Sequence, residues 1–322
     1  MPPRNWKEIA HELGRDRKGT DMRARILLSC VLLLTQDDIR AIQVVLKKAI
    51  VLEPQVKQQV LALTPEQVPK LIERASSNDI QAQCVLGVAY QRGTGVPRDE
   101  AQAIKWLSQA GIDGISWVQN LLGILYRHGG NVPQNYSEAF KWFLAAAEQR
   151  HAAAADSLGY MYLTGKGVAK DHSQAAHWYA IAATEGYAPA QNNLAQLYEH
   201  GSGVHKDYAT ALNLYRQAVQ KGLASAQNNL GVMYEAGLGV AKDYNEAVKW
   251  YRASAEQGEP VGQSNLAFMY AHGHGVQRDL REAAKWYARA AESGYAPAQG
   301  RLAQLYETGQ GVPLDYVMAY SW

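Results

Sequence analysis

The chain has 322 residues, 47% of them hydrophobic, and a formal net charge of +2 at pH 7. This composition allows a sizeable core, and the near-neutral charge gives no general attraction to nucleic acid or anionic lipid. The two cysteines, Cys30 and Cys84, lie in dissimilar contexts, which excludes a disulfide framework and a cysteine-based zinc site. The length fits two ordinary domains or one extended array of repeats.

Residues 1–36 comprise a polar leader, whose first 21 residues we expect to be poorly ordered, and the short apolar run Ile26–Leu34. This run is too short to span a bilayer, which needs roughly 20 residues. It fits either an ordinary buried helix or, if translation begins at Met22, the remnant of a signal peptide. No small-residue cleavage site follows it, which favours the buried helix and a cytoplasmic protein over export to the periplasm.

Residues 37–81 have a helical pattern that differs from the rest of the chain. Apolar residues at 39, 42, 46 and 50 form one helical stripe, and Pro54 and Thr64-Pro65 are typical of helix starts. We expect this segment to be an N-terminal helical cap, because a stack of repeats leaves the apolar face of its first unit uncovered.

From Ala82 to Trp322 the sequence repeats itself at a spacing of 36 residues. Each of the seven blocks has Leu at its fifth position, Gly or Ala at its sixth and Tyr at its ninth. The blocks begin at Ala82, Val118, Ala154, Ala190, Ala226, Gly262 and Ala298. The seventh block is truncated at Trp322, early in its second helix. Either the chain is a fragment, or a partner or a second copy covers this end by self-association.

Two glycines, one residue apart, follow the first half of most blocks, as in Gly93 and Gly95. A phosphate-binding loop would follow a strand and would not recur in every block, so we interpret these glycines as turns that end helices. In the second block Asn131 replaces the second glycine, which predicts a positive φ there, because Asn tolerates a left-handed backbone. Capping boxes are predicted after the turns, at Asp99…Gln102, Asn135…Glu138, Asp171…Gln174, Asp243…Glu246 and Asp279…Glu282.

The second half of each block is also helical in pattern, and six of the seven blocks carry a Trp there. We interpret this Trp column as core packing between stacked units. The predicted fold is all-α: a right-handed superhelical α-solenoid of helix-turn-helix repeats with a 36-residue period.

The columns read A-x-x-x-L-G-x-M-Y-x-x-G-x-G-V-x-x-D-Y-x-x-A-x-K-W-Y-x-x-A-A-E-x-G. This pattern resembles the Sel-one-like repeat, a branch of the tetratricopeptide-like α-solenoids with many bacterial members, and the spacing favours it over the 34-residue tetratricopeptide unit. The resemblance implies a scaffold or adaptor that binds a protein or peptide partner through a curved surface, without enzymatic activity or a cofactor. It does not name the partner.

Two other functions are alternatives to the adaptor. Cysteine-rich relatives with a disulfide in each repeat are linked to penicillin binding and β-lactamase activity, but this chain lacks those cysteine pairs. The alternative that stays open is an envelope protein that binds or hydrolyses peptidoglycan or β-lactam-type ligands. RNA binding by a helical array needs a basic groove with stacking residues, which the near-neutral charge disfavours. Neither a nucleic-acid partner nor an integral membrane segment is expected.

By analogy with tetratricopeptide-like solenoids, the first helices of the blocks line the concave face. Positions four, seven and eleven of each block share one helical face, and they vary while neighbouring columns stay constant. Asn can donate to and accept from an extended peptide backbone, and a Phe would supply an apolar anchor. The predicted binding residues are Asn193, Gln196, His200, Asn229, Asn265, Phe268 and His272. The alternative is that these columns are simply solvated surface.

Neither a metal site nor a catalytic site emerges from the pattern. His128, His200 and His272 share a column but lie two repeats apart, which separates them by roughly tens of ångströms when helices pack at about 8–10 Å. Zinc needs its ligands within about 2.1 Å. Ser, His and acidic residues are present, but no constellation of them breaks the repeat pattern.

Overall fold

The computed structural model describes residues 52–322, and in this range the regular secondary structure is entirely helical. The chain divides into two compact units, Met1–Gln58 and Gln59–Trp322. The predictions for the polar leader, the signal-peptide alternative and the apolar stripe at 39–50 lie outside the described residues. Within the described residues, no helix is long and apolar enough to cross a membrane.

The second unit consists mainly of helix pairs, whose first and second members we call A and B helices. Before them come a helix at residues 52–61, the 3-10 helix η1 (Pro65–Gln67) and α4 (Val68–Ser76). The A helices are α5 (Ile80–Arg92), α7 (Ser116–His128), α9 (Ala152–Thr164), α11 (Ala188–His200), α13 (Ala224–Ala236), α15 (Pro260–His272) and α17 (Ala296–Thr308). The B helices are α6 (Glu100–Ile112), α8 (Tyr136–Glu148), α10 (His172–Thr184), α12 (Tyr208–Gln220), α14 (Tyr244–Glu256), α16 (Leu280–Glu292) and α18 (Tyr316–Ser321).

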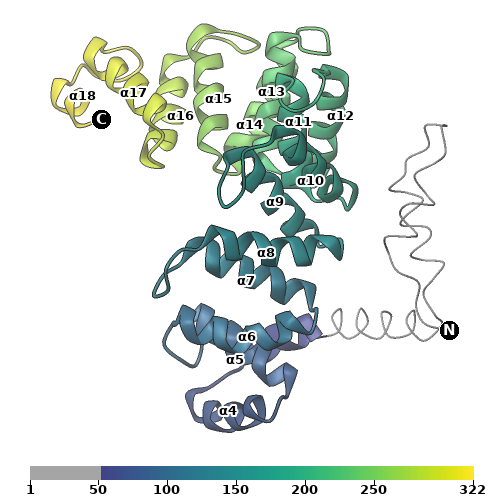
Figure 1. Ribbon diagram of the computed structural model, residues 1–322. Coiled ribbons are helices and arrows are strands. Elements are labelled where there is room, and N and C mark those ends of the chain that lie inside the picture. Colours follow the sequence, from purple (N-terminus) through teal and green to yellow (C-terminus); the bar gives the residue numbers. More distant parts are fainter. Residues whose placement is uncertain (1–51) are drawn as a thin grey trace, which may run out of the picture. The chain divides into compact units, whose positions relative to one another are not determined.

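Each helix from α5 onward packs against the helices that precede and follow it in the chain, as Figure 1 shows. A helices of successive repeats also touch, for example α7 with α9 and α13 with α15. Each 36-residue block thus forms one helix pair, and the predicted all-α solenoid is confirmed. Helix α4 packs against α5. That residues 37–81 serve as a cap remains a prediction.

The space between the two helices of a pair is filled by large side chains at one position of the B helices, which the sequence interpretation did not identify as core residues. It is the residue after the Trp column, and in the pairs from α5–α6 to α15–α16 it is at most 4% exposed: Leu107, Phe143, Tyr179, Tyr215, Tyr251 and Tyr287. The small residue at the sixth position of each block makes room for it, since a Cβ on Gly159 would lie 2.5 Å from the Tyr179 ring. The Trp residues are half-buried except Trp286, so the Trp column is not the main core column.

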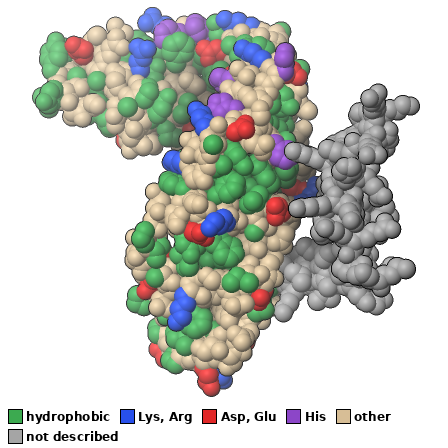
Figure 2. All heavy atoms as spheres, viewed as in Figure 1, with side chains coloured by type: hydrophobic (Ala, Val, Ile, Leu, Met, Phe, Trp, Pro, Cys, Tyr) green, Lys and Arg blue, Asp and Glu red, His purple; other side chains and the backbone are tan. Residues whose placement is uncertain are grey.

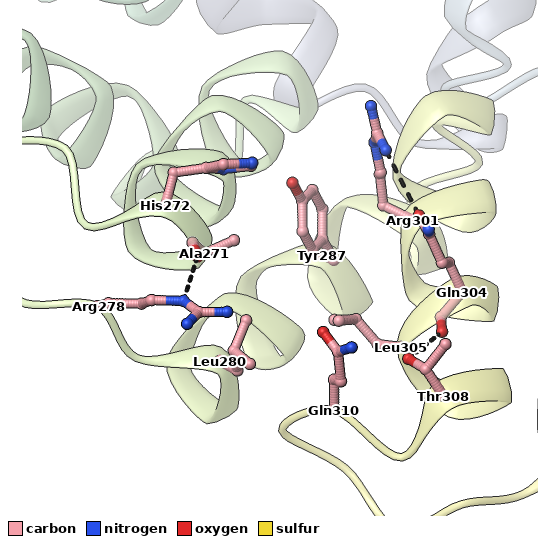
Figure 3. Close-up of a pocket in the computed structure, with 10 residues that line it drawn as sticks. All are labelled: Ala271, His272, Arg278, Leu280, Tyr287, Arg301, Gln304, Leu305, Thr308 and Gln310. Atoms are coloured by element: carbon pink, nitrogen blue, oxygen red, sulfur yellow. Dashed lines mark hydrogen bonds between the residues drawn. The ribbon is translucent and has the colours of Figure 1, made fainter.

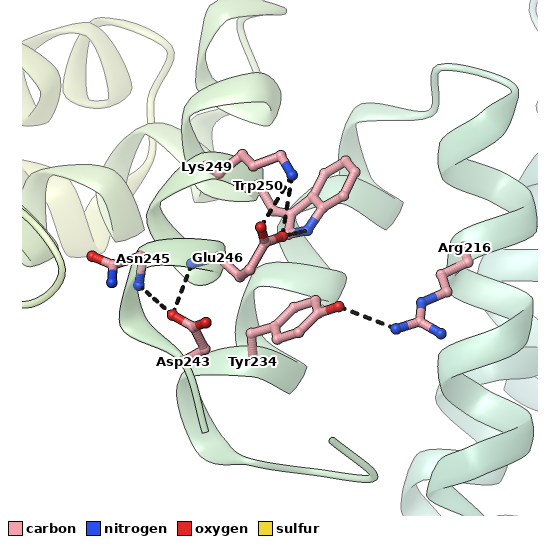
Figure 4. A network of polar contacts seen from close by, with 7 residues as sticks. All are labelled: Arg216, Tyr234, Asp243, Asn245, Glu246, Lys249 and Trp250. Atoms are coloured by element: carbon pink, nitrogen blue, oxygen red, sulfur yellow. Dashed lines mark hydrogen bonds and ion pairs between the residues drawn. The ribbon is translucent and has the colours of Figure 1, made fainter. Parts of the chain in front are cut away.

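The B helices begin with a side-chain cap, but the predicted reciprocal capping box is only half correct. Asp243 Oδ1 accepts from the backbone N–H of Asn245 (2.8 Å) and Glu246 (3.1 Å). The Glu246 carboxylate instead binds Lys249 and accepts from Trp250 Nε1 at 3.1 Å (Figure 4). The backbone N–H of Asp243 donates to the carbonyl of Tyr234 in the A helix. That carbonyl satisfies the amide, so the returning bond of a capping box is not needed.

The turn between the A and B helices also contacts the preceding repeat. Gly201 ends α11 in a left-handed conformation (φ 71°), and Gly203 follows with φ 74°. A Cβ on Gly203 would overlap the backbone carbonyl of His172 at the start of α10, so only glycine allows this close approach. The Ser173 hydroxyl donates to the Gly203 carbonyl oxygen across the same contact (3.1 Å).

The second repeat makes this contact in a different way, and the prediction for Asn131 is wrong. Gly129 and Gly130 take the positive φ angles there, and Asn131 does not. Asn131 Nδ2 donates to Asp99 Oδ1 at 2.8 Å, and its Oδ1 accepts from the backbone N–H of Ala101. The Asn131 side chain amide therefore makes the contact with the start of the preceding B helix, α6. In the other repeats a glycine occupies the position of Asn131.

Buried glutamines form a further link between repeats that the sequence interpretation missed. The Gln at the second position of a block donates its amide to a carbonyl near the end of the preceding helix, where backbone acceptors lack helical partners. These bonds are Gln83 to Ala75 (3.1 Å), Gln119 to Gly111 (2.9 Å), Gln191 to Ala183 (3.3 Å), Gln263 to Ala255 (3.3 Å) and Gln299 to Ala291 (3.2 Å). The recurrence of Gln at the second position of the blocks was the sequence signal that could have predicted this link.

The close approach at the turn can be measured with a matched pair of glycine variants. Gly203→Ala and Gly222→Ala both place Ala at a positive φ (74° and 79°), but only a Cβ at residue 203 meets another repeat. We expect Gly222→Ala to lower the free energy of unfolding by about 1–2 kcal/mol from backbone strain. Gly203→Ala should lower it by a further 1–3 kcal/mol or so, because the repeats must move apart. Urea denaturation followed by circular dichroism measures both, and equal losses would contradict the contact.

Candidate functional site

The predicted binding residues lie on one face of the A helices, which we call the A-helix face and define by positions four, seven and eleven of each block. Gln196, His200 and His272 are exposed there. The other four are half-buried: Asn193, Asn229, Asn265 and Phe268. The periodicity therefore places these seven side chains on a common face. That this face is concave and binds a peptide remains a prediction.

The asparagines of this face are engaged between repeats. Each donates its Nδ2 amide to an oxygen at the third position of the preceding block. The bonds are Asn193 to Asp156 Oδ1 (3.0 Å), Asn229 to Asn192 Oδ1 (2.9 Å) and Asn265 to Asn228 Oδ1 (2.8 Å). These contacts join successive A helices, so one amide donor of each Asn is already used in holding the array together.

Asp156 is the charged member of this series. Burial raises the pKa of its carboxyl group to about 6, although the Asn193 hydrogen bond and the Arg127 charge both act to lower it. The corresponding residues of the next two blocks are Asn192 and Asn228. An amide at position 156 would keep the acceptor for Asn193 and remove the buried charge.

Four rings gather where the fifth and sixth repeats meet, and two of them, Phe268 and His272, belong to the A-helix face. The Phe268 ring lies 4.1 Å from the His272 ring and 5.9 Å from the His274 ring, measured between centroids. Tyr244, at the start of the preceding B helix, stacks on His274 at 4.6 Å. His272 Nδ1 lies 2.9 Å from the Phe268 carbonyl oxygen, which accepts when Nδ1 carries the proton. The structure thus brings together Phe268 and His272 from the predicted set.

A pocket of about 480 Å³ adjoins this cluster, between α15, α16 and α17. Figure 3 shows Arg278, Tyr287 and Arg301 around it, with Tyr287 between the two arginines. His272 belongs to both the ring cluster and the pocket wall. The remaining lining residues are Ala271, Leu280, Gln304, Leu305, Thr308 and Gln310.

The pocket carries positive charge without a balancing acid. Arg278 Nε donates to the Ala271 carbonyl oxygen (3.0 Å), and Arg301 donates to Gln304 Oε1 (3.4 Å). None of the lining residues is Asp or Glu. Burial raises the pKa of Tyr287, and the positive charge of Arg301 acts to lower it. The site is therefore suited to a negatively charged group.

Elsewhere on the solenoid, some basic side chains are neutralised by ion pairs within their own helix. Lys141, Lys249 and Lys285 each pair with a glutamate three residues earlier on their own B helix. On the face drawn in Figure 2, acidic and basic side chains are interspersed rather than gathered into a patch of one sign. Within the described residues, neither Arg278 nor Arg301 forms an ion pair, so these two side chains differ from the paired lysines.

The sequence interpretation missed three of these residues. Arg278, Tyr287 and Arg301 come from a loop and two helices, and no motif connects them. One signal was available for Arg301: it occupies the column that holds Asn in the three preceding repeats. A charged residue at a position that otherwise holds hydrogen-bonded Asn indicates that this position has a different role between α15 and α17.

The described residues offer no site for metal or thiol chemistry. No group of three or more potential metal ligands occurs among them. Cys84 is buried, and burial raises the pKa of its thiol to about 12, so the thiol stays protonated at neutral pH.

Tandem helix pairs with one variable face define an α-solenoid repeat protein. The family model of the Sel1 repeat matches seven segments: residues 80–114, 118–151, 152–187, 188–223, 224–259, 260–295 and 296–322. The chain therefore belongs to the Sel1 repeat family, as the resemblance indicated. Proteins of this family generally act as protein-interaction scaffolds.

Two solved structures are similar in both sequence and fold. The first is c5321, a protective antigen of uropathogenic Escherichia coli with an SLR fold, at 34% identity and a TM-score of 0.69. The match covers 79% of this chain and 55% of that one, so this chain spans about half the length of c5321. The second is the Sel1 repeat protein from Oxalobacter formigenes, at 33% identity and a TM-score of 0.69, covering 74% of this chain and 94% of that one. Comparison with curated protein sequences gave no match.

The buried carboxyl group predicts a pH-dependent effect of Asp156→Asn. The pKa in the folded protein is about 6, against an ordinary value of 3.8, so the folded state binds more protons than the unfolded state between these values. The free energy of unfolding therefore decreases as pH rises from about 4 to 6. We expect Asp156→Asn to raise it by about 2 kcal/mol at pH 8 and by almost nothing at pH 4.

Urea titrations at the two pH values test this expectation, with Asp113→Asn as an exposed control. A change that is equal at pH 4 and pH 8 would show that the Asp156 carboxyl group carries no buried charge.

Proposed function

We propose that this protein is a non-enzymatic adaptor that binds an extended segment of a partner protein along the A-helix face. The ring cluster of Tyr244, Phe268, His272 and His274 beside an open pocket carries this proposal. Aromatic side chains in a cleft provide large contact areas at little entropic cost and commonly dominate the energy of interfaces. The scaffold role common in the Sel1 repeat family supports it.

The asparagine bonds refine which residues would contact the partner. Asn193, Asn229 and Asn265 each use an amide donor within the array, which leaves the Oδ1 atoms of Asn193 and Asn265 as acceptors. In Asn229 that oxygen already accepts from Asn228 (3.2 Å). The side chains at the seventh and eleventh positions would therefore supply most of the binding energy, and the asparagines would mainly keep successive A helices at a fixed spacing.

The seventh position changes its character along the array, which provides a basis for selectivity. It holds Tyr160, which is 38% exposed, then Gln196, then Val232, then Phe268. An extended segment that runs across successive A helices would meet aromatic, polar and apolar side chains in a fixed order. A partner is then chosen by the order of its side chains.

The test is capture of a partner on the immobilised full chain from a lysate of its own organism, quantified by mass spectrometry. We expect Phe268→Ala with His272→Ala to lower retention of a specific partner at least about tenfold, because an anchor of this kind contributes 2 kcal/mol or more. The matched control is Asn213→Ala with Gln220→Ala, two exposed positions of the B helix α12. Circular dichroism should show both variants folded.

Two outcomes would contradict the proposal. One is a partner retained equally by the wild type and the Phe268/His272 variant. The other is a partner lost only in the α12 control, which would assign binding to the B helices. Self-association through the last repeat, one of the two alternatives for the truncated seventh block, is tested by the same material in analytical ultracentrifugation.

A further inference from the structure

We propose that the pocket between α15, α16 and α17 binds a carboxylate of the partner segment, next to an apolar side chain packed on Phe268. This inference rests on the proposed function and adds the chemistry of what is bound. The recognition elements are the guanidinium groups of Arg278 and Arg301 and the hydroxyl of Tyr287.

Both arginines of the pocket have unused hydrogen-bonding capacity. A guanidinium group has five N–H donors in a planar fork, and a carboxylate offers about four acceptor positions. Arg278 uses Nε to bind the Ala271 carbonyl, which orients its terminal amino groups without consuming them. Arg301 has only a long contact with Gln304, at 3.4 Å. Both forks are therefore available for charge-assisted bonds to a carboxylate.

The junction between α15 and α17 differs from the earlier junctions between A helices. At three preceding junctions the fourth-position Asn binds the previous A helix through its amide, at 2.8 to 3.0 Å. At the α15–α17 junction, Arg301 replaces that Asn, and the residue it would meet is Ser264. No hydrogen bond joins Arg301 to Ser264, and Arg301 lines the pocket instead.

The helix ends around the pocket favour a carboxylate over a phosphate. Ala271 and His272 lie at the C-terminal end of α15, and Thr308 ends α17. Helix C-termini carry partial negative charge, which opposes a dianion more strongly than a single negative charge. The volume of about 480 Å³ lies within the usual range of ligand sites, about 300–1,000 Å³, and fits a chain terminus or an acidic side chain with its neighbours.

The neighbouring ring cluster predicts what accompanies the carboxylate. His272 contacts Phe268 on one side and the pocket on the other. A segment with its acidic group between the arginines would therefore place an adjacent side chain over Phe268. The bound sequence should combine an acidic group with an apolar or aromatic residue beside it.

The experiment follows the arginine Nε–Hε signals by NMR in the full chain, at constant ionic strength and pH 7.5. The signals of Arg278 and Arg301 are assigned by substitution. The probes are N-acetylglycine, which presents a chain-terminal carboxylate, and N-acetylglutamate α-amide, which presents a side-chain carboxylate. N-acetylglycinamide is the neutral control, and inorganic phosphate is the competing anion.

We expect a saturable shift of both arginine signals with at least one of the two carboxylate probes. The probe that binds more tightly identifies whether the pocket prefers a chain-terminal or a side-chain carboxylate. Arg301→Gln should weaken binding, seen at Arg278, by about tenfold or more, since a hydrogen bond to a charged group is lost. Arg281→Gln, an exposed position on α16, should leave it unchanged.

Three results would overturn the proposal: no saturable shift with either carboxylate, an equal shift with N-acetylglycinamide, or tighter binding of phosphate than of both carboxylates. The titration needs no partner protein, so its result stands apart from the capture experiment. If the pocket binds carboxylates but the Phe268/His272 variant loses no partner, the proposed binding along the A-helix face is wrong and the carboxylate site in the pocket stands.

Discussion

The close contact between each turn and the preceding repeat is the constraint on which the whole array depends. One helix pair cannot bury both of its apolar sides, so it is stable only when a neighbour covers it. Gly203, lying against the start of α10, shows how near the backbones must come. The buried Gln191, which binds the end of α10, fixes the other end of the same interface. Together these contacts set the spacing at which every other side chain of the face is presented.

This spacing explains how one part of the array can differ without disturbing the rest. Stability in a solenoid is mostly a sum over neighbouring repeats, so a change at one junction has local consequences. Asn229 and Asn265 each form an amide–amide hydrogen bond to the preceding A helix, which joins the two helices on the A-helix face. Where Arg301 takes that column, the amide pair is lost and a pocket is present. A binding site could thus arise at the α15–α17 junction while the turns and glutamine bonds remained in place.

The helices, their order and their lengths could be predicted from the sequence because the information is local and is repeated seven times. Leu158 and Leu230, at one block position, specify the same buried face, and Gly165 and Gly237 specify the same helix end. The errors came from partners that lie far away in the sequence. Asn131 resembles a left-handed turn residue when only its neighbours are considered, but its amide binds Asp99 in the previous repeat.

The sequence by itself determined the all-α repeat architecture and the face on which Phe268 and His272 lie, since a 3.6-residue period defines both. The tertiary structure decided which of these side chains are available. It showed that the asparagine amides are shared between repeats, that Tyr251 rather than Trp250 fills the pair, and that Arg278 and Arg301 border one pocket. The reason is physical: a repeat pattern specifies the direction of a side chain, whereas its partners depend on how two separate segments pack.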